Sequence, residues 1–188
     1  RAWNSRHGAL AIPGNHDSPT LIHRLKSAAH HVRWLEHELL TLPRADGTPL
    51  LRVLGSGHPE RVLDDMLTAG DDRSPPFTLA LVHYPTEIFA ASDLQGPARI
   101  DLILAGHTHG GQVRLRADLA PHTSCDLPPH LASGLLRRRD TLVAISRGLG
   151  EAVLPLRINC PPHAPIYVLR QSAPFAHAAP QLSPVLRW

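Results

Sequence analysis

The sequence is poor in cysteine, in aromatic residues and in long apolar runs, and each shortage excludes a class of protein. Its two cysteines, Cys125 and Cys160, are too few for a disulfide framework or a structural zinc knuckle, so we expect buried or free thiols. Aromatic residues make up only 4% of the 188 residues, and aliphatic side chains must therefore fill the core. The longest apolar runs, Leu79–Val82 and Leu102–Ala105, are far too short to cross a bilayer. These shortages favour one globular domain.

The start of the chain does not indicate where the protein is located in the cell. No N-terminal stretch has the basic, apolar and small-residue order of a signal peptide. The chain begins at Arg1 rather than Met, so the presence of a leader or membrane anchor before it is undecided. Both a cytoplasmic and an exported or membrane-associated location remain compatible with the sequence, which does not indicate an oligomeric state.

Positive charge is slight and comes mainly from arginine. The net charge is +3, and Arg137–Arg139 is the only dense basic run. Neither interleaved aromatic residues nor a nucleic-acid-binding module accompanies it. We therefore expect a solvated loop at Arg137–Arg139 and no nucleic-acid partner.

Periodicity and turn residues predict strands that alternate with helices. Ser18 followed by Pro19 predicts a helix start, because a hydroxyl suits the N-cap and a proline suits the first turn. Leu21, Ile22 and Leu25 would form the apolar face of this helix, and Glu60–Ala69 is a second expected helix. The expected strands are Gly8–Ile12, Val32–Leu35, Leu39–Leu42, Leu50–Leu54, Phe77–Val82, Ile100–Ala105, Leu142–Ser146 and Ile166–Arg170.

This alternation predicts an α/β layered domain over residues 1–170. Asp46–Gly47 is an expected turn between two of its strands, and Asp71–Pro76 is an expected polar loop. Proline and alanine dominate residues 171–188, which we expect to be a loosely held tail.

Candidate metal ligands open three loops, each directly after an apolar strand. Asn15 and His16 follow the first strand, His83 follows the second, and His107 and His109 follow the third. In open α/β sheets, sites form in the crevice at the carboxyl ends of the strands. The chain holds 14 histidines, so a histidine stands out only by its position, and these positions are equivalent.

Each loop also has a simpler interpretation. The His107–His109 pair lies among Gly106, Gly110 and Gly111, which either leave room for ions or merely form a glycine-rich turn. The Gly14–Asp17 segment either offers an amide oxygen and a proton donor or is only a turn and a helix cap. The occurrence of all three loops together favours the metal site.

In their order, these segments resemble the calcineurin-like metallophosphoesterase family. The family pattern is D-x-H, then G-D, then G-N-H-[DE], then an isolated H, then G-H-x-H, and the last three blocks are present here. Gly106–Gln112, together with Ser146–Gly150 and Leu156–Pro162, is similar to a bacterial branch of phosphodiesterase-like proteins. The resemblance covers roughly Gly8 to Arg170.

The resemblance implies a layered αββα sandwich and a site with two divalent ions, either Mn, Fe or Zn. Asn15, His83 and His107 match ligands of the second ion, and His109 matches a ligand of the first. His16 matches the residue that stabilises the transition state and protonates the leaving oxygen. A hydroxide bridging the ions would attack phosphorus. The implied substrate is a small-molecule or lipid-linked phosphoester, and the resemblance to this branch favours a diester.

Arg147 and Arg157 are weaker candidates for binding the substrate phosphate, because arginine binds phosphate with two parallel hydrogen bonds. Pairing of each arginine with a buried carboxylate or carbonyl is an equal alternative. Cys160 is expected to be a small buried apolar residue.

The first two blocks of the family pattern are absent from these 188 residues. The only G-D dipeptide, Gly70–Asp71, follows the Asn15–His16 pair and lies in a polar loop, so we reject it as the second block. The first ion would keep only His109, so at most one ion is well liganded. We expect this N-terminally incomplete domain to be inactive or impaired and to expose apolar surface. Membrane association through a segment preceding Arg1 stays open.

Three other functions remain as alternatives. A metallo-β-lactamase-type hydrolase also uses an H-x-H pair but continues to an Asp-His, where this chain has Gly110–Gln112. A truncated or degenerate remnant without catalytic activity would keep a partial metal site. A basic nucleic-acid-binding protein ranks last.

Overall fold

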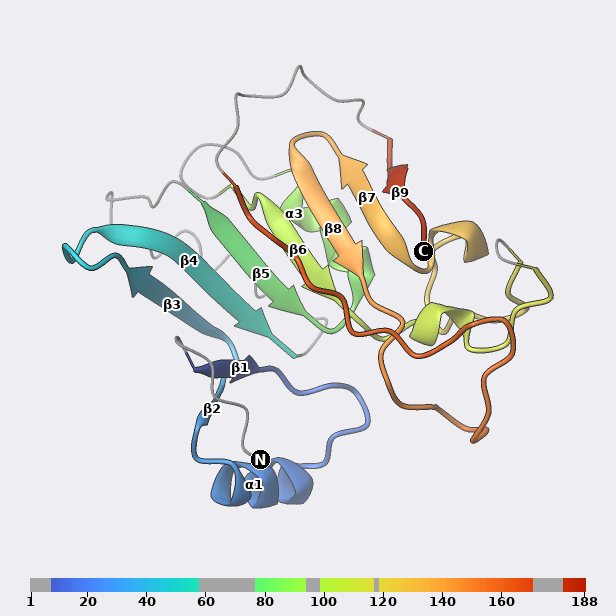
Figure 1. The fold of residues 1–188 in the computed structure, drawn as a ribbon, viewed down its shortest axis with the longest axis horizontal. Helices are drawn as coiled ribbons and strands as arrows, with labels where there is room; N and C mark the ends of the chain where they lie inside the picture. Colours follow the sequence, from blue (N-terminus) through green and yellow to red (C-terminus); the bar gives the residue numbers. More distant parts are fainter. Residues whose placement is uncertain (1–7, 58–76, 94–98, 117–118, 171–180) are drawn as a thin grey trace.

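The main body is a seven-stranded mixed sheet with few helices, which is consistent with an α/β fold (Figure 1). The computed structural model describes residues 8–57, 77–93, 99–116, 119–170 and 181–188. The strand order is β3-β4-β5-β6-β8-β7-β9. These strands are β3 (Glu38–Pro43), β4 (Pro49–Ser56), β5 (Thr78–Val82), β6 (Leu102–Ala105), β7 (Gly134–Arg138), β8 (Thr141–Ile145) and β9 (Ser183–Leu186).

The four inner strands β4, β5, β6 and β8 run parallel, so their carboxyl ends meet at one edge of the sheet (Figure 1). Leu54, Ile103 and Ile145 on these strands are fully buried, which fixes the register of each strand. His83 follows β5 and Gly106 follows β6 at this edge. The topology therefore brings two of the three histidine-bearing loops side by side.

A smaller parallel sheet of β1 (Ala9–Ala11) and β2 (Val32–Trp34) carries the third loop. It lies with helix α1 (Pro19–Ala28) below the main sheet in the view of Figure 1. Leu35, directly after β2, is fully buried, and a Cβ on Gly55 of β4 would lie 2.1 Å from the Leu35 Cβ. Glycine at position 55 thus allows the small sheet to pack closely against the main one.

Helix α1 begins as the sequence predicts but does not bury an apolar face. The Ser18 hydroxyl accepts a hydrogen bond from the Leu21 backbone N–H, as an N-cap does. No residue of α1 is buried, and the side chains of Leu21 and Leu25 are 40% and 38% exposed. The helix therefore contributes little to the core that the described residues form.

Among the described residues, the remaining short helices are η1 (Pro85–Glu87), α3 (Ile88–Ala91), η3 (His109–Gly111) and η4 (Pro129–Leu131). Ile88 and Ala91 of α3 are fully buried in the core of the main sheet. In the described part of the chain, no helix has the length and hydrophobicity needed to span a membrane.

Seven of the eight expected strands lie in β1, β2, β3, β4, β5, β6 and β8, with shifts of at most two residues at their ends. The expected strand at Ile166–Arg170 is wrong. This segment pairs with no described strand, and Ile166 and Val168 are 92% and 71% exposed. The turn at Asp46–Gly47 is confirmed, because Asp46 accepts from the Thr48 N–H and Gly47 has a positive φ.

The expected solvated loop at Arg137–Arg139 is also wrong, because Arg137 and Arg138 belong to β7. Leu136 of β7 is fully buried, and Arg138 donates to the Phe89 carbonyl and the Asp93 carboxylate. The arginines stay at the margin of the sheet while the alternate leucine enters the core.

The end of the chain is not wholly a loose tail. Residues 183–186 form β9, which pairs antiparallel with β7 at the edge of the main sheet. The Trp188 indole N–H donates to the Ile145 carbonyl, and the Trp188 carbonyl accepts from Ser133. The expected helix at Glu60–Ala69 and the expected loop at Asp71–Pro76 lie outside the described residues.

Candidate metal centre

The loop after β1 presents Asn15 and His16 from a tight turn. The Asp17 N–H donates to the Gly14 carbonyl, and the Gly14 N–H donates to the Asp17 carboxylate, at 3.1 and 2.8 Å. These two bonds close the turn and leave Asn15 and His16 exposed at its tip. Asp17 therefore holds the shape of the loop.

Glycine at position 14 allows the His83 ring to approach this turn. His83 directly follows β5 and is partly buried. A Cβ on Gly14 would lie 2.9 Å from the His83 Cε1 atom, closer than side-chain carbons approach in folded proteins. Gly14, the first residue of the G-N-H-D segment, thus allows close packing against His83, a predicted site residue from another loop.

Asn15 and His107 both approach the same atom, Nε2 of His83. The Asn15 Oδ1 atom lies 2.7 Å from it, and the His107 Nδ1 atom lies 3.0 Å from it. These side chains come from the ends of β1, β5 and β6, as the strand-end argument predicts. The structure therefore brings three of the five predicted site residues into direct contact.

Hydrogen bonding fixes the tautomer of His107. Its Nε2 atom lies 2.7 Å from the Ser124 carbonyl oxygen, which only accepts, so Nε2 carries a proton. The neutral ring then has its lone pair on Nδ1, directed toward His83. A backbone carbonyl behind a histidine is the arrangement that orients metal-ligating imidazoles.

Both rings are held in the neutral form that a metal ligand needs. Burial, followed by the nearby His107, lowers the pKa of His83 to about 4. Burial also lowers the pKa of His107, against an opposing effect of the bond to Ser124. The Tyr84 ring, with its centroid 4.3 Å from that of His107, covers the pair on one side.

The two acceptors place the His83 proton on Nε2 in this structure. The spacing of the three atoms fits a shared divalent ion after this proton moves to Nδ1 and the side chains move slightly outward. Ligand atoms about 2.1 Å from one ion, at tetrahedral or octahedral angles, are about 3.0–3.4 Å apart. The two measured separations are 2.7 and 3.0 Å. Among the described residues, no three His, Cys, Asp or Glu side chains form a group suited to a metal ion, so a metal site here would need the Asn15 amide as a ligand.

His109 faces the same cavity from the short helix η3, with a positive φ of 49°. Its Nδ1 atom lies 3.2 Å from the Gly150 carbonyl oxygen. The cavity has a volume of about 850 Å³ and is lined by Gly14, Asn15, His16, Asp17, His83, His107, His109, His122, Ser124, Cys125, Asp126, Glu151, Ala152 and Val153. All five predicted site residues thus line one cavity.

The sequence did not single out the opposite wall of this cavity. His122 and Asp126 line it from the loop between η3 and η4, and Glu151 lines it from the loop after β8. No motif marks these residues. The only available signal was the nearness of Glu151 to the Ser146–Gly150 segment of the family resemblance.

Gly110 and Gly111 do not leave room for ions. Both have positive φ angles, of 65° and 80°. A Cβ at Gly110 would lie 2.5 Å from Cγ of Arg147, and one at Gly111 would lie 2.3 Å from Cβ of Ala120. These two glycines therefore permit a tight turn and close packing, whereas Gly106, the third glycine of this segment, has open space around it.

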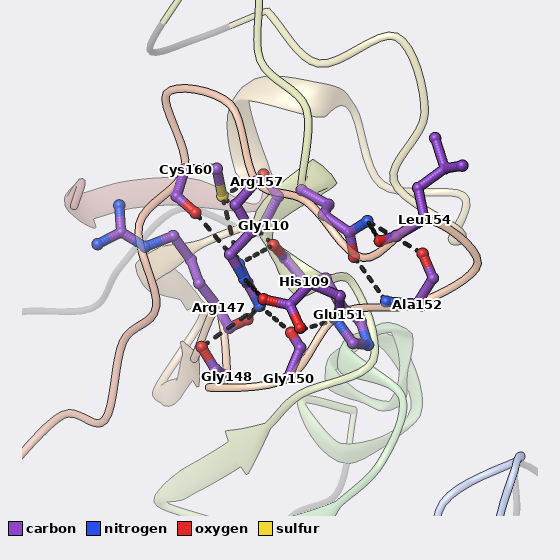
Figure 2. A network of polar contacts seen from close by, with 11 residues as sticks. His109, Gly110, Arg147, Gly148, Gly150, Glu151, Ala152, Leu154, Arg157 and Cys160 are labelled. Atoms are coloured by element: carbon purple, nitrogen blue, oxygen red, sulfur yellow. Dashed lines mark hydrogen bonds and ion pairs between the residues drawn. The ribbon is translucent and has the colours of Figure 1, made fainter.

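The two arginine candidates for phosphate binding are not among the residues that line the cavity. Arg157 donates from its terminal nitrogens to backbone carbonyls, which favours the alternative of a buried pairing (Figure 2). The guanidinium of Arg147 points away from this network in Figure 2, and its Nε atom is buried. Cys160 is buried and Cys125 is partly buried, and both are free thiols, as expected.

Comparison with known proteins finds three bacterial relatives. Over 182 residues, covering 92% of this chain and 59% of the relative, it is 29% identical to the uncharacterized metallophosphoesterase YkuE of Bacillus subtilis. Over 166 residues, covering 81% of this chain and 55% of the relative, it is 28% identical to the phosphodiesterase YaeI of Escherichia coli. It is also 28% identical to an uncharacterized metallophosphoesterase of Helicobacter pylori, over 84% of this chain and 41% of that protein.

These similarities support the metallophosphoesterase family that the three motif blocks indicate. The chain spans about half the length of the relatives it matches. No family model matches the chain, and no solved structure matches it.

Proposed function

We propose that this chain carries the histidine-rich half of a metal-dependent phosphoester hydrolase, in which Asn15, His83 and His107 hold one divalent ion. The observation that carries the proposal is the approach of the Asn15 amide oxygen and the His107 Nδ1 atom to a single nitrogen of His83. The names of the three relatives support the same class of reaction. Mixed amide and imidazole ligands suit Mn, Fe or Zn.

Each of the three proposed ligands is held in place by a different part of the structure. Asn15 is held by the turn that Gly14 and Asp17 close. His107 is oriented by the Ser124 carbonyl, and His83 by the rigid end of β5. Bound divalent ions would supply an activated water nucleophile and neutralise charge on the phosphoryl oxygens.

His16 is proposed as the catalytic residue that protonates the leaving oxygen. It lies next to Asn15 and is exposed to the cavity, where a substrate phosphoester would enter. His109 is proposed as a ligand of a first ion. The cavity, at about 850 Å³, has room for the phosphoester and both of its flanking groups, which fits a diester.

Within these 188 residues, the first ion has only one of the ligands that the family pattern gives it. No D-x-H block precedes Gly14, and His109 is the only matching ligand of that ion. We therefore propose that this polypeptide by itself binds one ion well and is inactive or strongly impaired. In the intact fold, residues 1–170 would belong to a layered αββα domain, with a small-molecule or lipid-linked phosphoester as substrate.

A metal-binding measurement tests the proposed metal site separately from catalytic activity. Isothermal titration of the metal-free chain with Mn²⁺ or Zn²⁺ should show one ion per chain, and replacement of His83 by alanine should weaken this binding. Hydrolysis of bis-(p-nitrophenyl) phosphate with manganese should be near background. Absence of any bound ion would contradict the site, whereas turnover comparable to that of an intact relative would contradict the proposed impairment.

A non-catalytic remnant with a partial metal site is the second candidate. The observation that favours it is the lack of a described group of three His, Cys, Asp or Glu side chains suited to a metal ion. Supplying D-x-H and G-D blocks by fusion to the matching half of a relative separates the two candidates. Recovery of manganese-dependent hydrolysis supports the hydrolase, and metal binding without hydrolysis supports the remnant.

A further inference from the structure

The carbonyl oxygen of Gly150 accepts hydrogen bonds from two side chains that are far apart in the sequence. The Arg157 Nη2 atom donates to it, and the His109 Nδ1 atom lies 3.2 Å from it (Figure 2). Gly150 lies in the loop that connects β8 to the last part of the chain, whereas His109 follows β6. One backbone oxygen thus links a buried arginine to a proposed metal ligand.

Arg157 is bound by backbone carbonyls and not by a carboxylate at hydrogen-bond distance. Its Nη1 atom donates to the carbonyls of His109 and Cys160, at 3.2 and 3.3 Å. Its Nη2 atom donates to three more carbonyls, those of Arg147, Gly148 and Gly150. The nearest carboxylate oxygen, on Glu151, lies 4.0 Å from Nε.

These bonds must form because the Arg157 side chain is only 5% exposed. A buried charge without partners costs several kcal/mol, so the loop from Arg147 to Gly150 is held around the guanidinium with its carbonyls turned inward. The position of the Gly150 oxygen therefore follows from the position of Arg157. Both terminal nitrogens are occupied, which leaves them unsuited to a substrate phosphate.

The Gly150 oxygen in turn dictates which nitrogen of His109 carries the proton. A carbonyl only accepts, so the His109 Nδ1 atom must donate, and the lone pair of the neutral ring then lies on Nε2. A metal ligand needs its lone pair on the nitrogen that faces the ion, and a hydrogen bond to the other nitrogen selects it.

We propose that Arg157 is a positioning residue that holds the Gly150 carbonyl against His109 and so keeps the His109 lone pair on Nε2, ready for a metal ion. This inference rests on the proposed function for the role of His109. Arg157 itself touches neither the ligand atoms nor the substrate cavity. It acts through the backbone, by its bonds to the loop from Arg147 to Gly150 and by the bond from its Nη1 atom to the His109 carbonyl.

Gln112 holds the residues that directly follow this loop, so the loop should stay attached when Arg157 is changed. Its side-chain amide accepts from the Ala152 N–H and donates to the carbonyls of Ala152 and Leu154, at 2.7, 3.0 and 2.9 Å. Replacement of Arg157 by lysine retains the charge but not the planar group that reaches carbonyls on both of its sides. This variant therefore tests orientation of the Gly150 carbonyl with the rest of the loop still attached.

Long-range ¹H–¹⁵N spectra of the metal-free chain, labelled on its histidines, report the tautomer of His109 directly. The wild-type chain should carry the proton on Nδ1, and Arg157→Lys should reduce that population to less than half. Arg114→Lys is the matched control, because Arg114 is also buried and donates to a carbonyl of the same region, that of Gly110. It should leave the His109 tautomer unchanged.

Two results would overturn the proposal. The first is a wild-type spectrum in which the His109 proton lies on Nε2. This result needs no variant, so the test stays decisive even if Arg157→Lys does not fold. The second is an unchanged His109 tautomer in a folded Arg157→Lys chain. Because the spectra are recorded without metal, failure of the chain to bind Mn²⁺ or Zn²⁺ would contradict the proposed function and leave this result intact.

Discussion

The amide oxygen of Asn15 lies 2.7 Å from Nε2 of His83, although the two residues are 68 positions apart in the sequence. One comes from the small sheet and the other from the centre of the main sheet. This contact therefore depends on how the two sheets pack and is sensitive to the residues between them. The first predictions concern these residues.

Loss of His83 should weaken metal binding. His83 is the residue that both Asn15 and His107 approach, so its imidazole would contribute one of the proposed ligands and hold the other two in place. His83→Ala should raise the dissociation constant for Zn²⁺ by at least about 10–100-fold, the range seen when even a supporting residue of a metal site is lost. Isothermal titration measures this change.

His122→Ala is the control, because His122 lines the same cavity and its recorded bond is to the Ser124 hydroxyl, not to a proposed ligand. An unchanged dissociation constant in His83→Ala, or an equal loss in His122→Ala, would argue against the proposed ligand set.

A methyl group at position 14 should disturb the contact between the sheets. A Cβ there would lie 2.9 Å from the His83 ring, so Gly14→Ala should lower the free energy of unfolding by about 1–3 kcal/mol, as overpacking does. Gly106→Ala adds the same methyl group in open space and should have a smaller effect. Urea denaturation of both variants measures the difference, and equal destabilisation would contradict the steric account.

Stability should fall in mild acid because of His83. Its pKa is about 4 in the folded chain, because of burial, and returns to 6.5 on unfolding. Between these values the unfolded chain binds more protons, so the free energy of unfolding is unaffected above pH 6.5 and falls as the pH drops toward 4. His83→Gln should flatten this part of the curve, whereas His122→Gln should not.

Denaturant unfolding of the metal-free chain at half-unit steps between pH 4 and pH 7.5 measures the effect. A slope in His83→Gln equal to that of the wild type would show that other groups cause the acid sensitivity.

Gln112 should protect the loop that forms one wall of the cavity. Gln112→Ala removes the bonds to Ala152 and Leu154, so the Ala152 amide should exchange its hydrogen markedly faster. Gln112→Glu keeps an acceptor for the Ala152 N–H and should retain part of the protection. Hydrogen exchange followed by NMR distinguishes these cases, and equal protection in wild type and Gln112→Ala would mean that the amide does not hold the loop.

Strand positions and strand ends are readable from the sequence because they depend on local patterns. The apolar runs of β5 and β6, and the Ser18–Pro19 start of α1, follow from burial and capping. β7 was missed because the arginines at its end conceal the alternating burial around Leu136. Ile166–Arg170 has the composition of a strand but no partner among the described strands.

The candidate site likewise combines features that local sequence patterns predict with features that depend on contacts between distant residues. The five predicted site residues line one cavity, as their places after apolar strands suggest. The tautomer of His107 could not be predicted, because it depends on a carbonyl 17 residues away in a loop without a motif. The sequence left open whether Gly110 gives ions room or only forms a turn. Its neighbour in space is Arg147, and such a contact leaves no trace in the local sequence.

The location of a bound ion tests the central claim most directly. A crystal of the chain grown or soaked with Mn²⁺ should give an anomalous difference peak about 2.0–2.3 Å from the Asn15 Oδ1, His83 Nε2 and His107 Nδ1 atoms together. No peak at these atoms, or a peak elsewhere in the cavity that none of them touches, would contradict the account.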